Sequence, residues 1–439
     1  MFWLVGELGH KYTRSLIFGL AVGFFATVAL ARAYPTLLKR WFTPTDRIGI
    51  VGEFTPTTLP LSVQNLISYG LTSVDVTGYP QPALASSWEA TDSGRVFIFE
   101  LKRDYLWHND KPVEAKDVNY NIRNVTFTDE GPHRLKATLL SPYSPFPSLV
   151  AKPIFRPGLI GFGPYKVDAI SLRGDTVSFL RLVPVTDPKD RTLEYRFYRT
   201  EQLAILGYKL GEIDRIEDLS TIEPLKSWEN TRVVEQSRYN RIVSLFFNLN
   251  NPLLKEKSVR QGLAYAVPKL EFERAYSPLA KKSWAYSDNV RRYIFDPSQA
   301  EKLLADIKEG TQSAELTITT FPQYLDVAKI IADSWNTLGI KTQVKVEGAL
   351  SSGFEVLLSA QDVPPDPDQY PFWHSTQTQT NVSGYVNVKI DKLLEDGRQE
   401  LDIANREKIY VDFQRRLVDD APVVFLYYPN SYTVLRGSR

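Results

Sequence analysis

Composition and charge describe a large globular protein without thiol chemistry. The chain has 439 residues, of which 43% are hydrophobic and 12% aromatic, so it can bury more than one core. Its 52 basic and 51 acidic residues leave a formal net charge of +1, which gives no bulk attraction for nucleic acid. The absence of cysteine excludes disulfides, thiolate metal sites and cysteine nucleophiles.

The first distinctive segment is the uncharged, apolar run from Ser15 to Ala31. As a helix it would cover roughly 26 Å, close to the hydrocarbon thickness of a bilayer. It is longer than the apolar core of most cleaved signal peptides, which favours one uncleaved transmembrane helix within an anchor and linker at residues 1–47. Two alternatives stay open: Ala31 and Ala33 resemble a signal-peptidase site, and the run could be a buried core helix.

After this linker the pattern becomes that of an α/β protein. Residues 95–101 are β-branched and aromatic and follow a turn at 92–94, which predicts a strand in a hairpin with residues 87–90. Recurring prolines between residues 129 and 164 predict an irregular connection without long helices or central strands.

The second half of the chain contains clear helical and strand periods. Apolar residues lie on one helical face over 326–338, and Gly339 stands where a left-handed cap would end that helix. The alternation of apolar and polar residues over 340–346 then predicts a strand. A second helix is predicted over 406–418, and residues 423–428 then form a buried strand.

No arrangement of residues in the sequence requires a reaction. The zinc-protease, nucleophile-elbow, Walker A and dinucleotide motifs are absent, and only four histidines occur. His108 lies in a polar turn, where a hydrogen-bonded loop imidazole is expected, whereas His374 beside Trp373 has a better claim to function. We therefore predict a protein that is not an enzyme and uses no cofactor or metal. A hydrolase would instead require one of these histidines to contact a serine and an acid.

An ordered series of motifs resembles the dipeptide- and oligopeptide-binding proteins of ABC importers, the bacterial solute-binding proteins of family 5. No single motif is specific; the order and the gaps carry the resemblance, which covers Val51 to Tyr428. The matching segments are 82–89 (PALASSWE), 97–103 (FIFELKR), 107–110 (WHND), 114–118 (EAKDV), 161–167 (GFGPYKV), 259–267 (VRQGLAYAV) and 295–304 (FDPSQAEKLL).

The resemblance implies an α/β, two-lobed periplasmic-binding-protein-like fold with a ligand cleft between the lobes. Lobe I is expected at 48–235, with 418–439 returning to it, and lobe II at 236–417. The two crossovers are expected near 234–245 and 418–424. Asp117 suits a helix N-cap. The stretch between Asp117 and Gly163 is shorter than is usual in the family, so part of lobe I is trimmed.

The ligand site is sought in the stretch from Ser359 to Tyr370. It resembles the family loop in which an aspartate holds the α-ammonium group of a peptide, since a buried ammonium needs a compensating anion. Asp362 is the first candidate, although Ser359 stands where the family often has tryptophan. The alternative is a solvated acidic loop that binds no ligand. The complete predicted ligand-binding set is Asp362, Asp366, Asp368, Tyr370 and His374.

The function implied by the resemblance is extracytoplasmic substrate binding. The protein would bind peptides or related small solutes and deliver them to an ABC permease, as a monomer anchored to the cytoplasmic membrane by its N-terminal helix. No nucleic-acid partner is expected. The alternative is a membrane-tethered sensor or assembly partner that keeps the binding fold without import.

Overall fold

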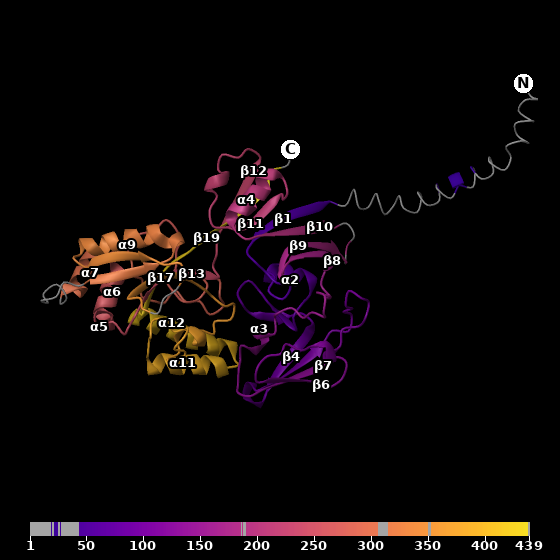
Figure 1. Cartoon of the computed structure of the whole chain (residues 1–439). Coiled ribbons are helices and arrows are strands. Elements are labelled where there is room, and N and C mark those ends of the chain that lie inside the picture. Colours follow the sequence, from indigo (N-terminus) through magenta and orange to yellow (C-terminus); the bar gives the residue numbers. More distant parts are fainter. Residues whose placement is uncertain are drawn as a thin grey trace, which may run out of the picture.

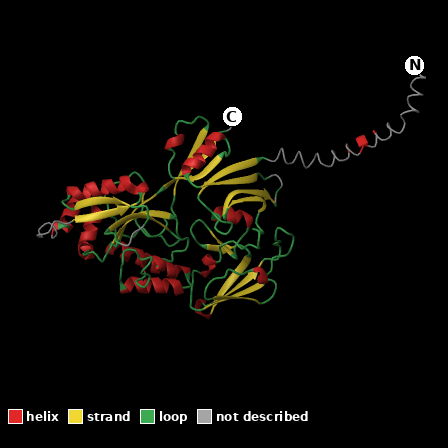
Figure 2. Ribbon diagram, in the orientation of Figure 1, coloured by secondary structure: helices red, strands yellow, loops and turns green. Residues whose placement is uncertain are grey.

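The computed structural model describes residues 44–185, 187, 190–305, 315–349 and 353–437, with a few isolated positions near the N-terminus. The expected transmembrane helix at 15–31 lies almost entirely outside these residues. A helix with the length and apolarity to span a bilayer does not occur in the described part of the chain. Three larger sheets with their helices, and a two-stranded sheet of β2 and β3, form the body of the described molecule (Figures 1 and 2).

The seven-stranded sheet carries the N-terminal part of the fold. Its central strand β1 runs parallel to both neighbours, β10 and β11. Ile48 and Ile50 on β1 join an apolar cluster with helix α2, and Val51 packs against the cluster of helix α4 on the other face. The strands, in spatial order, are β12 (Thr231–Ser237), β19 (Asn430–Arg436), β11 (Arg215–Leu219), β1 (Thr45–Val51), β10 (Thr192–Tyr198), β9 (Thr176–Pro184) and β8 (Tyr165–Arg173), with α2 (Leu61–Ile67), α4 (Glu201–Leu210) and η3 (Glu223–Leu225).

The six-stranded sheet forms the second α/β unit. Its strands β13 and β18 are almost continuously buried, because helices cover the sheet (Figure 1). The strands, in spatial order, are β14 (Glu273–Arg274), β18 (Val423–Tyr428), β13 (Arg241–Phe247), β17 (Val356–Asp362), β15 (Glu315–Thr320) and β16 (Lys341–Val346). The helices are α5 (Pro252–Lys255), α6 (Lys257–Tyr265), α7 (Pro297–Leu303), η4 (Pro322–Tyr324), α9 (Leu325–Thr337), α10 (Tyr370–Trp373), α11 (Val388–Gln399) and α12 (Ile403–Asp420).

A four-stranded antiparallel sheet completes the fold, with the order β4-β5-β7-β6. The predicted hairpin is confirmed, since β4 pairs with β5 across the short turn η1. The prediction that no central strand occurs after Asp129 is wrong: β7 lies in the proline-free gap between Pro132 and Pro142. The elements are β2 (Thr72–Val74), β3 (Pro80–Pro82), β4 (Ala85–Thr91), η1 (Asp92–Gly94), β5 (Val96–Leu101), η2 (Ala115–Asp117), β6 (Val125–Asp129), β7 (Arg134–Leu139) and α3 (Phe146–Leu149).

Two connections join the seven-stranded and six-stranded sheets. The first runs from β12 to β13 through residues 238–240, within the expected range. The second passes through Pro429, between β18 and β19, and not through 418–424 as expected. The apolar strand β18 pairs with β13, so it belongs to the six-stranded sheet; only β19 returns to the other.

The helices and strands of the second half follow their sequence periods closely. Helix α9 ends one residue before Leu338, and Gly339 takes the positive φ of +83° that lets the chain turn into β16. Helix α12 extends the predicted helix in both directions, with Asp402 capping its N-terminus through the backbone N–H of Asn405 at 2.9 Å.

Asp117 is not the helix N-cap that the sequence suggested. Glu114 occupies that position, and the Asp117 carboxylate reaches back to accept from the Glu114 N–H at 3.1 Å. It also accepts from Nη2 of Arg156 at 2.7 Å and from the Trp107 ring N–H at 3.1 Å. Burial alone would raise the pKa of Asp117, but these hydrogen bonds outweigh it and hold the pKa below its ordinary value.

Candidate functional site

The first predicted ligand residue, Asp362, lies at the crossover between the two large sheets. It ends β17 opposite Arg241, the first residue of β13. Its side chain is 79% exposed, and its carboxylate lies 3.5 Å from the Arg241 guanidinium. The backbone N–H of the next residue, Val363, donates to the carbonyl of Asn240 at 2.8 Å, which fixes this end of β17 to the crossover. Asp362 is therefore an accessible anion at the crossover.

Asp366 and Asp368 differ from Asp362 because arginines of the same unit already neutralise them. Asp366 is buried, and its carboxylate accepts hydrogen bonds from both Nη atoms of Arg406, on α12, at 2.8 and 2.6 Å. Asp368 is also buried and accepts from Nε of Arg398, from α11, at 3.0 Å. Bidentate arginine pairs of this kind satisfy a carboxylate fully. These two acids hold the loop between β17 and α10 on helices α11 and α12.

Tyr370 and His374 extend the same ionic cluster. Their rings stack with centroids 4.0 Å apart, and the Arg398 guanidinium lies 3.9 Å from the Tyr370 ring centroid. The His374 ring is buried, its Nε2 lies 3.4 Å from the Glu395 carboxylate, and its Nδ1 lies 2.8 Å from the Thr376 hydroxyl. The predicted set is therefore split: Asp362 lies at the crossover, and the other four residues form one cluster in which Asp366, Asp368 and His374 are buried and Tyr370 is partly exposed.

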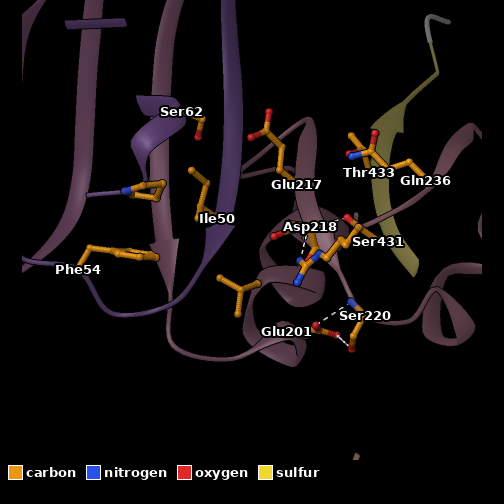
Figure 3. Close-up of a pocket in the computed structure, with 13 residues that line it drawn as sticks. Ile50, Phe54, Ser62, Glu201, Glu217, Asp218, Ser220, Gln236, Ser431 and Thr433 are labelled. Atoms are coloured by element: carbon orange, nitrogen blue, oxygen red, sulfur yellow. Dashed lines mark hydrogen bonds and ion pairs between the residues drawn. The ribbon is translucent and has the colours of Figure 1, made fainter. Parts of the chain in front are cut away.

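A cavity of about 610 Å³ lies on the seven-stranded sheet beside the first crossover. Phe54 and Ile50 form one side of it, and polar side chains form the other (Figure 3). Its size is within the usual range of small-ligand pockets. The lining residues are Ile50, Val51, Phe54, Pro60, Ser62, Glu201, Glu217, Asp218, Ser220, Gln236, Arg238, Ser431 and Thr433.

Asp218 is the strained residue of this cavity. Its φ is +69°, in the left-handed region that a residue with a side chain seldom adopts, and it lies where the pairing of β11 with β19 shifts register. Ser431 on β19 donates its hydroxyl to the Asp218 carboxylate at 2.6 Å, and Arg238 forms an ion pair with the same carboxylate. These contacts hold the strained irregularity of β11 and attach it to both crossover segments.

The polar wall of the cavity is acidic. Glu201, Glu217 and Asp218 face Arg238, and Glu217 also forms an ion pair with Arg215 beside the cavity at 3.2 Å, which leaves one negative charge in excess. Glu201, in the first turn of α4, accepts from both the N–H and the hydroxyl of Ser220, at 2.8 and 2.9 Å (Figure 3). The cavity therefore favours a ligand that presents a positive or hydrogen-donating group.

The four-stranded sheet contacts the six-stranded unit at the ionic cluster. The Tyr143 hydroxyl donates to Asp368 at 3.2 Å, and the Ser144 N–H donates to the Arg398 carbonyl at 2.6 Å. Burial raises the pKa of Tyr143, with the Asp368 charge acting in the same direction, so the phenol stays a hydrogen donor. This contact therefore joins the four-stranded sheet to the six-stranded unit at a site that is far in sequence from the crossovers.

Gly78 allows a second close approach between the same two units. A Cβ at this position would lie 2.0 Å from the carbonyl oxygen of Pro365, and its φ of +82° also favours glycine. Nearby, the backbone N–H of Trp284 donates to the Thr77 carbonyl at 3.0 Å. The loop between β2 and β3 is thus packed directly against the loop that carries Asp366.

The two histidines singled out in the sequence, His108 and His374, do not form the arrangement that a serine hydrolase needs. Nε2 of His108 lies 3.0 Å from the Gly163 carbonyl, as expected for a loop imidazole, and burial lowers the pKa of His108. Ser375 donates its hydroxyl to Asp391 at 2.6 Å and not to the neighbouring His374. No group of three or more metal-ligating side chains occurs among the described residues.

Comparison with known proteins decides the family. The sequence model of the bacterial extracellular solute-binding proteins, family 5, matches residues 79–382. The chain belongs to this family. Its members are solute-binding components of transport systems and not enzymes, and they act outside the cytoplasm.

Two curated members illustrate the range of solutes in family 5. The oligopeptide-binding protein AppA of Bacillus subtilis is 22% identical over 453 residues, which are 85% of this chain and 82% of AppA. Heme-binding protein A of Haemophilus influenzae is 22% identical over 446 residues, which are 81% of this chain and 80% of that protein. At this level of identity the binding role is common, while the ligands differ.

Solved structures show the same fold. NikZ from Campylobacter jejuni, in complex with Ni(L-His), superposes with a TM-score of 0.72 at 25% identity, covering 89% of this chain and 94% of NikZ. AppA from Bacillus subtilis, in complex with a nonapeptide, gives a TM-score of 0.67 at 20% identity over 89% of this chain and 94% of AppA. The α/β fold of the periplasmic solute-binding proteins is therefore established for this chain.

The cavity residues were not found from the sequence. They come from five separate segments, at 50–62, 201, 217–220, 236–238 and 431–433, and no local spacing joins them. The structural signal that identifies them is the positive φ of Asp218 next to Arg238 and Ser431. The sequence alone does not reveal this positive φ, because aspartate is also common in ordinary turns.

Proposed function

We propose that this protein is the extracytoplasmic substrate-binding component of an ABC importer. It binds peptides or related small solutes in a cleft between two lobes and delivers them to a membrane permease. The seven-stranded and four-stranded sheets form lobe I, and the six-stranded sheet forms lobe II. The crossovers at 238–240 and Pro429 act as the hinge. The protein acts as a monomer, anchored by the run from Ser15 to Ala31.

The observation that carries this proposal is the free edge of β17 at the crossover. β17 pairs with β13 along its whole length, but its pairing with β15 ends at Leu358. No strand of the described residues pairs with the remaining part, Ser359–Asp362, on that edge, and its first three residues are only partly buried. An extended ligand backbone can add there as a further strand.

Asp362 supplies the charge that such a ligand needs. It ends the free edge, is largely exposed, and its ion pair with Arg241 is long at 3.5 Å, so its carboxylate is open to a second cation. The α-ammonium of a peptide aligned along Ser359–Asp362 provides that cation. The acidic cavity beside Arg238 on lobe I then offers space for a side chain or a small solute.

The Asp362→Asn variant tests the assignment of the ammonium site. We expect the affinity for a peptide to fall by about 10- to 150-fold, because hydrogen bonds to charged groups contribute about 1.5–3 kcal/mol. Unfolding should barely change, since the side chain is exposed. The measurement is calorimetric titration with a defined peptide mixture, with nickel–histidine as a separate arm because NikZ is solved with Ni(L-His).

Two results would revise the proposal. Equal peptide affinities for the wild type and Asp362→Asn would remove Asp362 from the site. If neither a peptide nor nickel–histidine binds the wild type, import of these solutes is ruled out, and the tethered sensor or assembly partner becomes the function to test. Asp368→Asn is the matched control, because its carboxylate already binds Arg398 and should affect stability more than affinity.

A further inference from the structure

Helix α4 exposes an apolar stripe. Leu203, Leu206 and Leu210 are 47%, 50% and 67% exposed, and their spacing places them on one helical face. The opposite face is buried against the seven-stranded sheet through Ala204 and Tyr208. Glu201 opens the helix, but no acidic residue occurs from residue 202 to 210. The outer face of α4 therefore carries three exposed leucines, and residues 202–210 add no acidic side chain to it.

A basic cavity adjoins the C-terminal end of α4. It has a volume of about 460 Å³ and is lined by Thr45, Asp46, Arg47, Arg191, Asp214, Arg215, Leu435, Arg436 and Gly437. The four arginines face two aspartates, and Glu217 beside the cavity forms an ion pair with Arg215 at 3.2 Å, which leaves one positive charge in excess. Asp214 is shared, since its carboxylate lies 2.8 Å from Arg47 and 3.4 Å from Arg436. The cavity can therefore accept further anions.

The basic cavity meets the stripe at the C-terminal end of α4. Arg47 donates to the carbonyl of Gly211, the C-cap residue of α4, at 2.9 Å. The Arg436 guanidinium lies beneath the helix, 4.6 Å from the ring centroid of Tyr208 on the buried face of α4. We call this the α4 face: Leu203, Leu206 and Leu210 with the four arginines of the cavity. Figure 1 shows α4 at the same end of the molecule as β1.

The chain reaches β1 at this face from its N-terminal segment. Thr45, the first residue of β1, itself lines the basic cavity. If residues 15–31 span the membrane, residues 32–44 connect the bilayer to this point. Fully extended, that connection reaches at most roughly 45 Å, about the diameter of one domain or less. The α4 face is thus within reach of the lipid surface.

We propose that the α4 face docks on the anionic surface of the membrane. The three leucines enter the interfacial region, and the arginines of the basic cavity bind phosphate groups of acidic lipids. This inference rests on the proposed anchoring by residues 15–31. Docking fixes the orientation of lobe I on the bilayer while lobe II remains free to move at the hinge.

A single-cysteine label on the full chain tests the docking. The chain has no cysteine, so Leu206→Cys gives one attachment point for an environment-sensitive fluorophore. Val388→Cys, 80% exposed on α11, is the matched control in lobe II. In vesicles of phosphatidylethanolamine and phosphatidylglycerol, spin-labelled lipids should quench the label at residue 206 and leave the label at residue 388 bright. Phosphatidylcholine vesicles should give weaker quenching.

Charge is tested separately on the Leu206→Cys background. Arg191→Gln should lower the ratio of docked to undocked molecules about fivefold, because a basic residue near an anionic surface contributes about that factor. Arg191 is 57% exposed in an ion pair with Asp46. Arg292→Gln is the control, since Arg292 is 49% exposed in an ion pair with Asp288 and lies in lobe II. It should leave the ratio unchanged.

The outcomes separate docking from anchoring. If the wild type does not float with vesicles, both the anchor and the docking are refuted. If it floats but residue 206 is quenched no more than residue 388, the anchor stands and the docking is refuted. If residue 206 is shielded from an aqueous quencher yet not reached by labelled lipid, protein covers the stripe and lipid docking is again refuted.

Discussion

Replacing Asp366 by asparagine should lower the free energy of unfolding by about 3–5 kcal/mol, because it leaves a buried arginine without its anion. The Arg406 guanidinium is almost fully buried and receives its charge compensation from Asp366 at 2.6 and 2.8 Å. Burial alone would lower the pKa of Arg406, but the Asp366 charge raises it above its ordinary value. The neutral amide cannot replace this interaction.

Urea unfolding followed by circular dichroism measures the effect. Asp362→Asn is the matched control, because it makes the same chemical change four residues earlier, at an exposed side chain that ends β17, and its free energy of unfolding should stay near that of the wild type. If Asp366→Asn unfolds like the wild type and instead loses affinity for ligand, Asp366 is a ligand residue and not part of the scaffold.

Arg398→Met should also cost about 3–5 kcal/mol, since the buried Asp368 carboxylate would lose its partner. The variant additionally removes the stacking of the guanidinium on Tyr370, at 3.9 Å from the ring centroid. Because Tyr143 donates to Asp368 across the contact between the four-stranded sheet and the six-stranded unit, the change should also loosen that contact.

Hydrogen exchange distinguishes the local effect from general destabilisation. The amide of Ser144, which donates to the Arg398 carbonyl, should exchange faster in Arg398→Met under conditions where the β13 amides remain protected. Arg398→Lys keeps the charge but not the planar fork, and should lie between the wild type and the methionine variant. Uniformly faster exchange over the whole chain would argue against a specific contact.

Elements with a strong local period could be predicted from the sequence, and those defined by distant partners could not. α9, β16 and α12 follow from the spacing of their apolar residues, which depends only on neighbours along the chain. The apolar run of β18 correctly indicates a buried strand, but nothing in it tells which sheet it joins. The position of the second crossover was therefore misplaced.

The same reason explains the partial success at the site. Asp362, Asp366 and Asp368 look equivalent in the sequence. The arginines that neutralise Asp366 and Asp368 lie 40 and 30 residues further along the chain, so the sequence near the acids does not reveal them. Burial and pairing distinguish a structural acid from an available one, and both are properties of the fold. The resemblance to a known family located the loop, and the structure left one accessible carboxylate on it.

Native mass spectrometry of the protein, purified without denaturation from its own cell envelope, tests the central claim most directly. A binding protein with an anionic hinge site should carry a population of bound molecules of peptide-like or small-solute mass. Asp362→Asn, purified in the same way, should retain much less of that population. Spectra that show only the bare chain for both proteins, together with no heat on titration of peptides or nickel–histidine, would contradict solute binding at this hinge.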